Sequence, residues 1–121
     1  MTDAPLLLVV DDDPSVLLLV DVLAEKMGFR VKAVSNGLQA LEHLRDGLQP
    51  SVILLDIMME RIDALTFMNQ LREMPALEET PVIAMSTAAV LERYGEQLQV
   101  SGTLLKPITA PTLSQALGKY R

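Results

Sequence analysis

The chain alternates short, wholly apolar runs with longer stretches in which apolar residues recur every three or four positions. The short runs are typical of β-strands buried on both faces, and the periodic stretches are typical of amphipathic helices. Strict alternation of five strands and five helices predicts an α/β fold, a parallel sheet with helices on both faces. The expected strands are residues 6–10, 29–34, 52–55, 82–85 and 103–105, and the expected helices are residues 14–27, 38–45, 64–73, 88–99 and 110–117.

Polar residues and glycines mark where these elements begin and end. Asp13 is a natural N-cap, and the proline after it suits the first position of a helix. Asp63 and Thr109 stand in the same position before two later helices. Asn36-Gly37 is typical of a turn, and Gly28 provides a C-terminal stop for the first helix.

Three of the expected strands stop abruptly at charged residues. Asp11, Asp12 and Asp13 follow the first strand, Asp56 follows the third, and Lys106 follows the fifth. The carboxyl ends of parallel strands meet at one edge of an open sheet, which is where such folds bind ligands. Carboxylates and one ammonium group at this edge predict a site for a divalent cation and a phosphoryl group.

Each of these residues also has an ordinary structural explanation. Asp11 and Asp12 fit a solvated acidic cluster as well as a metal site, because adjacent carboxylates repel unless a cation is present. Asp56 is either a nucleophile towards phosphorus or a strand-end carboxylate that pairs with Lys106. Ser86, at the end of the fourth strand, either donates to a phosphoryl oxygen or caps the next helix. From the single residues, both explanations stay open.

Composition narrows the function. The 121 residues suffice for one domain with an ordinary core, so we expect a single domain over residues 1–121. The absence of cysteine excludes disulfides and thiolate metal sites and fits a reducing cytoplasm. The net charge of −6 argues against a nucleic-acid surface, and apolar runs of at most five residues are too short for a membrane span, which needs about 20.

In combination, these segments resemble the receiver domain of response regulators. The resemblance covers essentially the whole chain and implies a flavodoxin-like (βα)5 fold with strand order 2-1-3-4-5. It implies a phosphoacceptor signalling switch rather than an enzyme, with self-catalysed phosphoryl transfer and autodephosphorylation only. The matching segments are Leu8-Val9-Val10-Asp11-Asp12-Asp13-Pro14, Asn36-Gly37 through Ala40-Leu41, Pro50 through Asp56-Ile57-Met58-Met59, Ile62-Asp63, Pro81-Val82-Ile83 through Ser86, and Leu105-Lys106-Pro107.

The resemblance assigns expected roles to four residues that would share a metal ion. Asp56 matches the phosphoacceptor. Asp12 matches the direct Mg²⁺ ligand of the acidic pair, and Asp11 matches its water-mediated partner. The backbone carbonyl of Met58 matches a further ligand. Mn²⁺ is a possible substitute for Mg²⁺.

The resemblance also implies two phosphate-contacting residues and a set of partners. Ser86 matches the switch hydroxyl and Lys106 the phosphate-binding lysine. The phosphoryl donor would be a phosphohistidine of a histidine kinase or a histidine phosphotransfer protein, and an unknown downstream protein would receive the signal. We expect a cytoplasmic monomer or weak dimer that contacts neither nucleic acid nor membrane.

Several positions depart from the family pattern. Thr103 stands where an aromatic residue is usual, which puts the usual signal route in doubt, and Thr87 replaces a smaller residue beside the site. Glu60 and Ala64 replace a usual proline and glycine in the loop after Asp56. Residues 86–106 form a segment about two residues shorter than usual, which predicts a truncated or displaced fourth helix.

The first helix is apolar around more than one face. Helical spacing predicts a core stripe and leaves Leu17 and Leu18 partly outside it. This surplus is either a hydrophobic patch that docks a phosphoryl donor or an over-wide core helix. The expected stripe consists of Val16, Leu19, Val20 and Leu23.

Two alternative functions remain. A degenerate receiver would keep the fold and bind partners without phosphorylation. Thr103, Thr87 and the shortened fourth unit support it, whereas the intact set of site residues argues against it: Asp11, Asp12, Asp56, Ser86 and Lys106. A phosphatase of the haloacid dehalogenase type is remote, because that family needs a late acidic pair and none follows Lys106.

Overall fold

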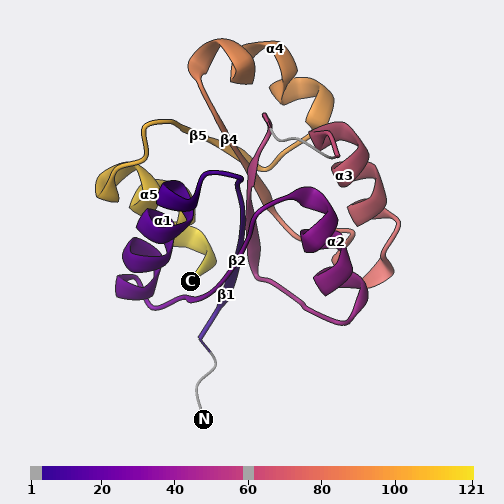
Figure 1. Cartoon of the computed structure of the whole chain (residues 1–121), viewed down its shortest axis with the longest axis horizontal. Helices are drawn as coiled ribbons and strands as arrows, with labels where there is room; N and C mark the ends of the chain where they lie inside the picture. The colour runs from indigo at the N-terminus through magenta and orange to yellow at the C-terminus, as the bar shows by residue number, and fades with distance from the viewer. Residues whose placement is uncertain (1–3, 59–61) are drawn as a thin grey trace.

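The computed structural model describes residues 4–58 and 62–121 and shows one five-stranded parallel sheet, ordered β2-β1-β3-β4-β5 (Figure 1). The expected fold class and strand order are confirmed. None of the described helices is a candidate for crossing a membrane. The strands are β1 (Leu6–Val10), β2 (Arg30–Val34), β3 (Val52–Asp56), β4 (Val82–Ser86) and β5 (Gly102–Leu105), and the helices are α1 (Pro14–Lys26), α2 (Gly37–Arg45), α3 (Ala64–Arg72), α4 (Ala88–Leu98) and α5 (Ala110–Leu117), with 3₁₀ turns η1 (Pro75–Leu77) and η2 (Gly118–Tyr120).

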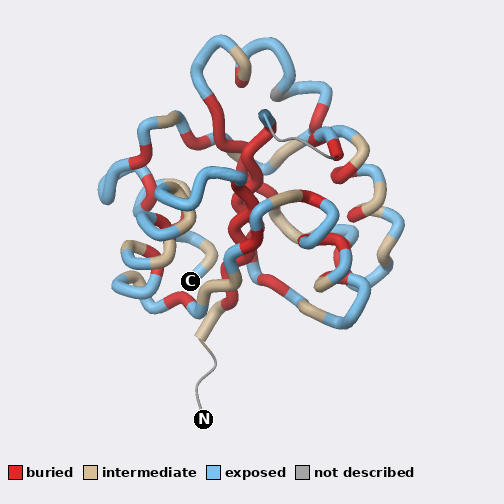
Figure 2. Tube along the Cα trace, viewed as in Figure 1, coloured by how far each residue is buried: buried red, intermediate tan, exposed pale blue. Residues whose placement is uncertain are grey.

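The three central strands are buried along their whole length, because helices cover both faces of the sheet (Figure 2). The edge strands β2 and β5 each have residues that are exposed to solvent. Val10 pairs with Leu55, and Asp56 pairs with Met85 on the other side of β3. Each central strand therefore ends one residue beyond its neighbour, from β1 to β3 to β4, and the residues that follow them meet at one edge.

Each face of the sheet has its own hydrophobic core. Leu41 of α2, Phe67 of α3 and Leu91 of α4 belong to one cluster. Val20 of α1 and Leu113 of α5 belong to the other. Figure 1 shows α1 and α5 together on one side of the sheet and α2 and α3 on the other. Burying a side chain of this size contributes about 1.5–3 kcal/mol, so both layers hold the sheet firmly.

The helix starts follow the capping chemistry of the sequence. The Asp13 carboxylate accepts from the Ser15 backbone N–H at 2.9 Å, and the Asp63 carboxylate accepts from the Thr66 N–H at 2.8 Å. Thr109 forms a reciprocal capping box. Asn36 caps α2 as well, so the expected turn is itself the start of the helix.

The expected core stripe of α1 is partly wrong. Leu19 is 40% exposed, whereas Leu17 is half-buried and packs against the core between the sheet and α5. Helix α1 contacts α5 as well as the strands, and this second contact decides which face turns inward. The exposed apolar residues of α1 are Leu18, Leu19 and Val22.

Helix α4 is not truncated. It spans 11 residues, more than the nine of α3, and it begins two residues after β4 ends. Gln99 closes it in the left-handed region, with φ of 53°, where glycine is the more usual residue. The truncation expected from the short segment is therefore wrong.

Candidate functional site

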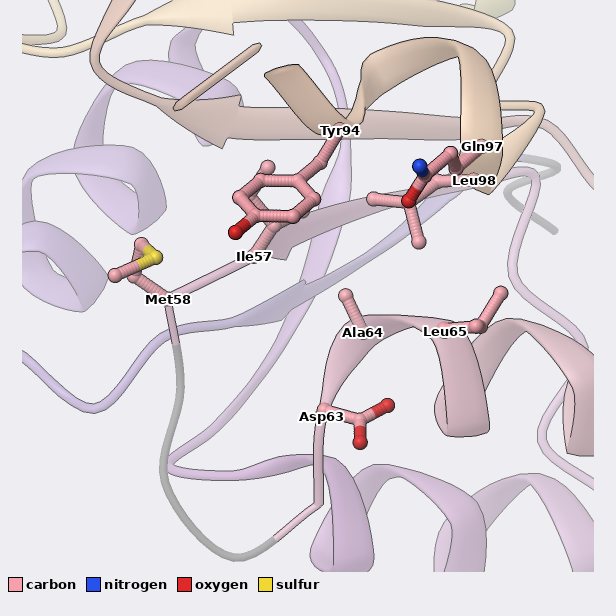
Figure 3. A pocket seen from close by; sticks show the side chains of 8 residues that line it. All are labelled: Ile57, Met58, Asp63, Ala64, Leu65, Tyr94, Gln97 and Leu98. Carbon is pink, nitrogen blue, oxygen red and sulfur yellow. The ribbon is translucent and has the colours of Figure 1, made fainter. Parts of the chain in front are cut away.

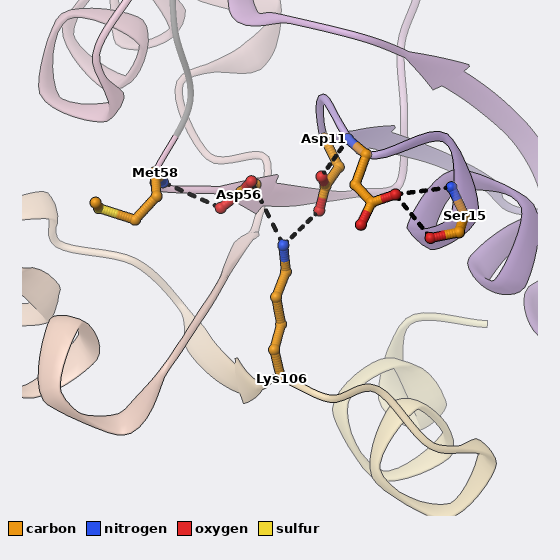
Figure 4. Close-up of polar contacts among 6 residues, drawn as sticks. Asp11, Ser15, Asp56, Met58 and Lys106 are labelled. Atoms are coloured by element: carbon orange, nitrogen blue, oxygen red, sulfur yellow. Dashed lines mark hydrogen bonds and ion pairs between the residues drawn. The ribbon is translucent and has the colours of Figure 1, made fainter.

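Three charged side chains from three strands meet at the carboxyl edge of the sheet (Figure 4). Lys106 follows β5, and its Nζ lies 2.8 Å from Oδ2 of Asp11, which follows β1. The same Nζ lies 3.4 Å from Oδ2 of Asp56, the last residue of β3. Lys106 thus bridges the two carboxylates that the sequence placed at separate strand ends.

Both bridged carboxylates are buried. Asp11 is 0% exposed and Asp56 is 4% exposed. Burial raises the pKa of Asp56 above its ordinary value, and the Asp11 charge adds to this, while the Met58 N–H and the Lys106 ammonium oppose it. Burial alone would lower the pKa of Lys106, but the hydrogen bond with Asp11 and the charges of both carboxylates outweigh it, so the pKa is raised. The lysine is therefore firmly charged.

Asp12 completes an acidic triad. Asp11, Asp12 and Asp56 each offer an oxygen within 4.8 Å of the others, and Asp12 is exposed. Asp13 is not part of this group, because its carboxylate accepts from both the amide and the hydroxyl of Ser15. The helix-cap explanation of Asp13 is confirmed.

The triad has the chemistry of a hard-cation site. Its donors are carboxylate oxygens, which suit Mg²⁺ and Mn²⁺, and the exposed Asp12 leaves the group open to solvent. Among residues 4–58 and 62–121, three carboxylates face one ammonium here, so this group keeps a negative charge when all are ionised. A divalent cation would offset that charge.

Backbone hydrogen bonds hold the residues beside Asp56 in position. The Met58 backbone N–H donates to Asp56 Oδ1 at 3.0 Å, a contact that the sequence did not suggest. Ser86 ends β4, is 3% exposed, and through its carbonyl accepts from the Lys106 N–H at 3.0 Å. The ends of β3, β4 and β5 are thus tied together around the Asp56 carboxylate.

The described departures from the family pattern are not members of this group. Thr87 is exposed at the N-cap of α4 and makes no side-chain cap bond, and Thr103 is exposed on β5. Ala64 is buried at the start of α3. Glu60 lies outside the described residues.

One neighbour of the site had no role in the sequence analysis. Tyr94 of α4 borders a cleft together with Ile57 and Met58, just beyond Asp56. Its only signal in the sequence is an aromatic residue within a helix whose other apolar positions already supply a core stripe.

The sequence profile of the response regulator receiver domain matches residues 7–118. The chain belongs to this family. It is a receiver domain, a signalling module rather than a classical enzyme.

Curated relatives carry comparable receiver sequences within longer chains. The chain is 35% identical over 128 residues to the probable C4-dicarboxylate response regulator DctR of Halalkalibacterium halodurans, covering 99% of the receiver and 54% of DctR. It is 33% identical over 115 residues to the histidine-protein kinase BarA of Escherichia coli K12, covering 93% of the receiver and 12% of BarA. The receiver therefore spans about half or less of these relatives.

Solved structures share the fold. The chemotaxis response regulator CheY4 of Vibrio cholerae has a TM-score of 0.88 at 24% identity, with 98% of the receiver and 99% of CheY4 covered. The receiver domain of the sensor histidine kinase PA1611 from Pseudomonas aeruginosa PAO1, which has a magnesium ion in its active site cleft, has a TM-score of 0.86 at 22% identity, with 97% of both chains covered.

Proposed function

We propose that this receiver is a phosphoacceptor switch in which Asp56 takes a phosphoryl group from a phosphohistidine of a histidine kinase or a histidine phosphotransfer protein. The observation that carries the proposal is the Asp56 carboxylate, which is buried at the sheet edge, belongs to the acidic triad and lies beside Lys106. A carboxylate oxygen of Asp56 would bond to phosphorus, the P–N bond of the donor would break, and its electron pair would return to the imidazole.

The chain's own groups prepare this transfer. Lys106 holds a positive charge 3.4 Å from Asp56 and offsets the charge of the incoming phosphoryl oxygens. The Met58 N–H fixes the other oxygen of Asp56, so the carboxylate keeps one orientation. The Ser86 hydroxyl, on the neighbouring strand end, would donate to a phosphoryl oxygen and so pass the change to α4.

We also propose that Asp11, Asp12, Asp56 and the Met58 carbonyl hold Mg²⁺, or Mn²⁺ in its place. The triad geometry and the magnesium ion in the PA1611 receiver support this set. The ion, when bound, neutralises charge on the transferring phosphoryl group.

The phosphoryl donor would dock over α1. Leu18 is 67% exposed and Val22 is 46% exposed on the helix that begins directly after the acidic pair. An apolar surface beside the acceptor suits a helical partner protein. We propose one receiver domain over residues 1–121, working in the cytoplasm as a monomer or weak dimer and passing its signal to another protein rather than to nucleic acid or a membrane.

A second candidate is a receiver that binds partners without phosphorylation. Thr103 supports it, because its small polar side chain on β5 cannot swing an aromatic ring inward when the site changes. A phosphatase of the haloacid dehalogenase type has less support. Its nucleophile would sit on the first strand, where both oxygens of Asp11 are already engaged by Lys106 and the Asp13 amide.

Intact mass after incubation with Mg²⁺ and acetyl phosphate tests the proposal. The parent protein should gain the mass of one phosphoryl group, and Asp56→Ala should gain none. Asp46→Ala is the matched control, since Asp46 is an exposed aspartate at the end of α2. No gain in a folded, Mg²⁺-binding parent would reject phosphorylation and favour the second candidate.

A further inference from the structure

An open cleft of about 300 Å³ lies between α3 and α4, one step beyond the Asp56 site (Figure 3). Helix α4 forms one wall, and the start of α3 with the two residues that follow β3, Ile57 and Met58, forms the other. In Figure 3 the Tyr94 hydroxyl is on the side of the ring nearer Met58, and both residues line the cleft with Ile57. The residues that line it include Ile57, Met58, Asp63, Leu65, Tyr94 and Leu98.

The rim of this cleft is unusually apolar for a surface. Met58 is 62% exposed, Leu65 is 48% exposed and Tyr94 is 40% exposed. They come from three separate segments, so the folded chain, and not one over-long helix stripe, gathers them. Large apolar side chains that collect around a hollow are typical of surfaces that take up an anchor side chain from a partner protein.

The polar groups of the cleft favour a cation. Asp63 supplies the only charged side chain among the described residues that line it. One Asp63 oxygen caps α3, and this hydrogen bond from the Thr66 N–H lowers the pKa of Asp63, which keeps the carboxylate ionised at neutral pH. Arg93 lies outside the lining, with its guanidinium 5.7 Å from the centre of the Tyr94 ring. The cleft therefore offers an apolar floor with negative charge at its edge.

We propose that this cleft receives an apolar side chain that is flanked by a lysine or arginine on a partner protein, with the apolar group between Tyr94 and Leu65 and the cation beside Asp63. The volume suits one large side chain rather than a whole cofactor. Met58 borders the cleft, and its N–H holds Asp56, so the occupant contacts the segment that carries the acceptor. The site is distinct from the exposed apolar face of α1.

Disulfide tethering tests the cleft directly, because the chain has no cysteine of its own. Gln97→Cys places a single thiol on the α4 wall and leaves the apolar rim intact. Gln115→Cys is the matched control, an exposed glutamine on α5 beside an uncharged hollow. The thiolate attacks the disulfide of a probe, bonds to one sulfur and releases cysteamine from the other.

Each probe is a disulfide between two cysteamine units. One unit is free cysteamine, and the amine of the other is joined to an amino acid by an amide bond. The amino acid is phenylalanine with a free ammonium, acetylated phenylalanine, succinylated phenylalanine, or alanine with a free ammonium. With excess reductant, intact mass gives the equilibrium fraction modified. At Gln97→Cys we expect the equilibrium constant for modification to be about ten-fold larger for the phenylalanine probe with a free ammonium than for the alanine probe, because the ring is buried. The same constant should be about two- to five-fold larger than for the succinylated phenylalanine probe, because the ammonium forms an exposed ion pair.

Two further variants separate the two contributions. Tyr94→Ala should remove the preference for phenylalanine over alanine. Asp63→Asn still caps α3 and should remove only the preference for the ammonium. Circular dichroism checks that each variant is folded.

The proposal is overturned if the probes modify Gln97→Cys and Gln115→Cys with the same preferences, or if the succinylated probe is preferred. Concentration-dependent dimerisation of the parent that Tyr94→Ala abolishes would make a second copy the occupant and also overturn it. The assay contains neither Mg²⁺ nor a phosphodonor, so its failure leaves the proposed phosphoacceptor function untouched.

Discussion

Replacing Lys106 with methionine removes the ammonium that bridges two buried carboxylates while keeping a stem of similar size. The Nζ distances of 2.8 and 3.4 Å to Asp11 and Asp56 correspond to gross attractions of roughly 6 and 5 kcal/mol at an effective dielectric constant of about 20. Most of this is offset by the desolvation of the lysine, whose side chain is 26% exposed. We expect a net loss of about 2–3 kcal/mol in the free energy of unfolding, below the 3–5 kcal/mol of a fully buried pair.

The loss should depend on pH. The pKa of Asp56 is raised by burial in the folded protein, so its ionised form costs stability at neutral pH, and a proton relieves that cost as the pH falls through the raised value. Removing Lys106 raises this pKa further, because the ammonium lowers it in the parent. The destabilisation should therefore be greatest near neutral pH and smaller in mild acid.

Urea unfolding followed by far-UV circular dichroism, in the absence of divalent cations, measures the effect from about pH 7.5 to pH 5. Lys26→Met is the control, since Lys26 is exposed in the last turn of α1 and should cost less than about 0.5 kcal/mol. On an Asp56→Asn background the Lys106→Met cost should fall, because only Asp11 then loses its partner. A cost equal to the control, or one that neither pH nor Asp56→Asn changes, would refute the electrostatic argument.

Four further results should follow. Asp56→Asn should raise the free energy of unfolding of the metal-free protein at neutral pH by about 0.5–2 kcal/mol, because it removes a desolvated charge; a urea titration that shows destabilisation contradicts this. Asp63→Ala should cost about 1 kcal/mol from loss of the α3 cap, and Asp63→Asn much less. The aspartyl phosphate should be long-lived, because Met58 and Ala88 match the family positions that influence attack of water on the acyl phosphate and neither side chain orients water well; rapid loss of label after donor removal would disprove it. Leu18→Glu should abolish phosphotransfer from a donor protein but leave acetyl phosphate labelling and the fold unchanged, as expected if Leu18 lies at the docking surface.

Much of the fold could be predicted because burial on both sheet faces demands wholly apolar strands. Residues 6–10 and 52–55 are apolar at every position and form strands that are buried along their whole length. The charged residues that end or follow these strands mark the edge of the sheet. The helix caps Asp13 and Asp63 could also be predicted, because a carboxylate before a helix finds its hydrogen-bond partner within three residues.

Other features depend on contacts between distant segments and left no local sign. The inward face of α1 is decided partly by α5, nearly a hundred residues later in the chain. For this reason Leu17 packs against the core and Leu19 is exposed, the reverse of what helical spacing predicts. Likewise, Met58 and Tyr94 share a cleft because the fold packs α4 beside α3 and the residues that follow β3. Spacing within one helix carries no information about either arrangement.

The arrangement at the sheet edge is costly to the fold and useful to the proposed chemistry for the same reason. A buried aspartate surrounded by apolar strands would be more stable as a neutral residue, yet Asp56 is held between Lys106 and the Met58 amide, with Asp11 beyond the lysine. These partners fix the carboxylate in place without neutralising the acidic group as a whole, since three carboxylates share one ammonium. The remaining negative charge favours a cation, and the fixed oxygens favour attack from one direction. If Asp56→Asn stabilises the protein while abolishing phosphorylation, the two effects will have come from the same carboxylate.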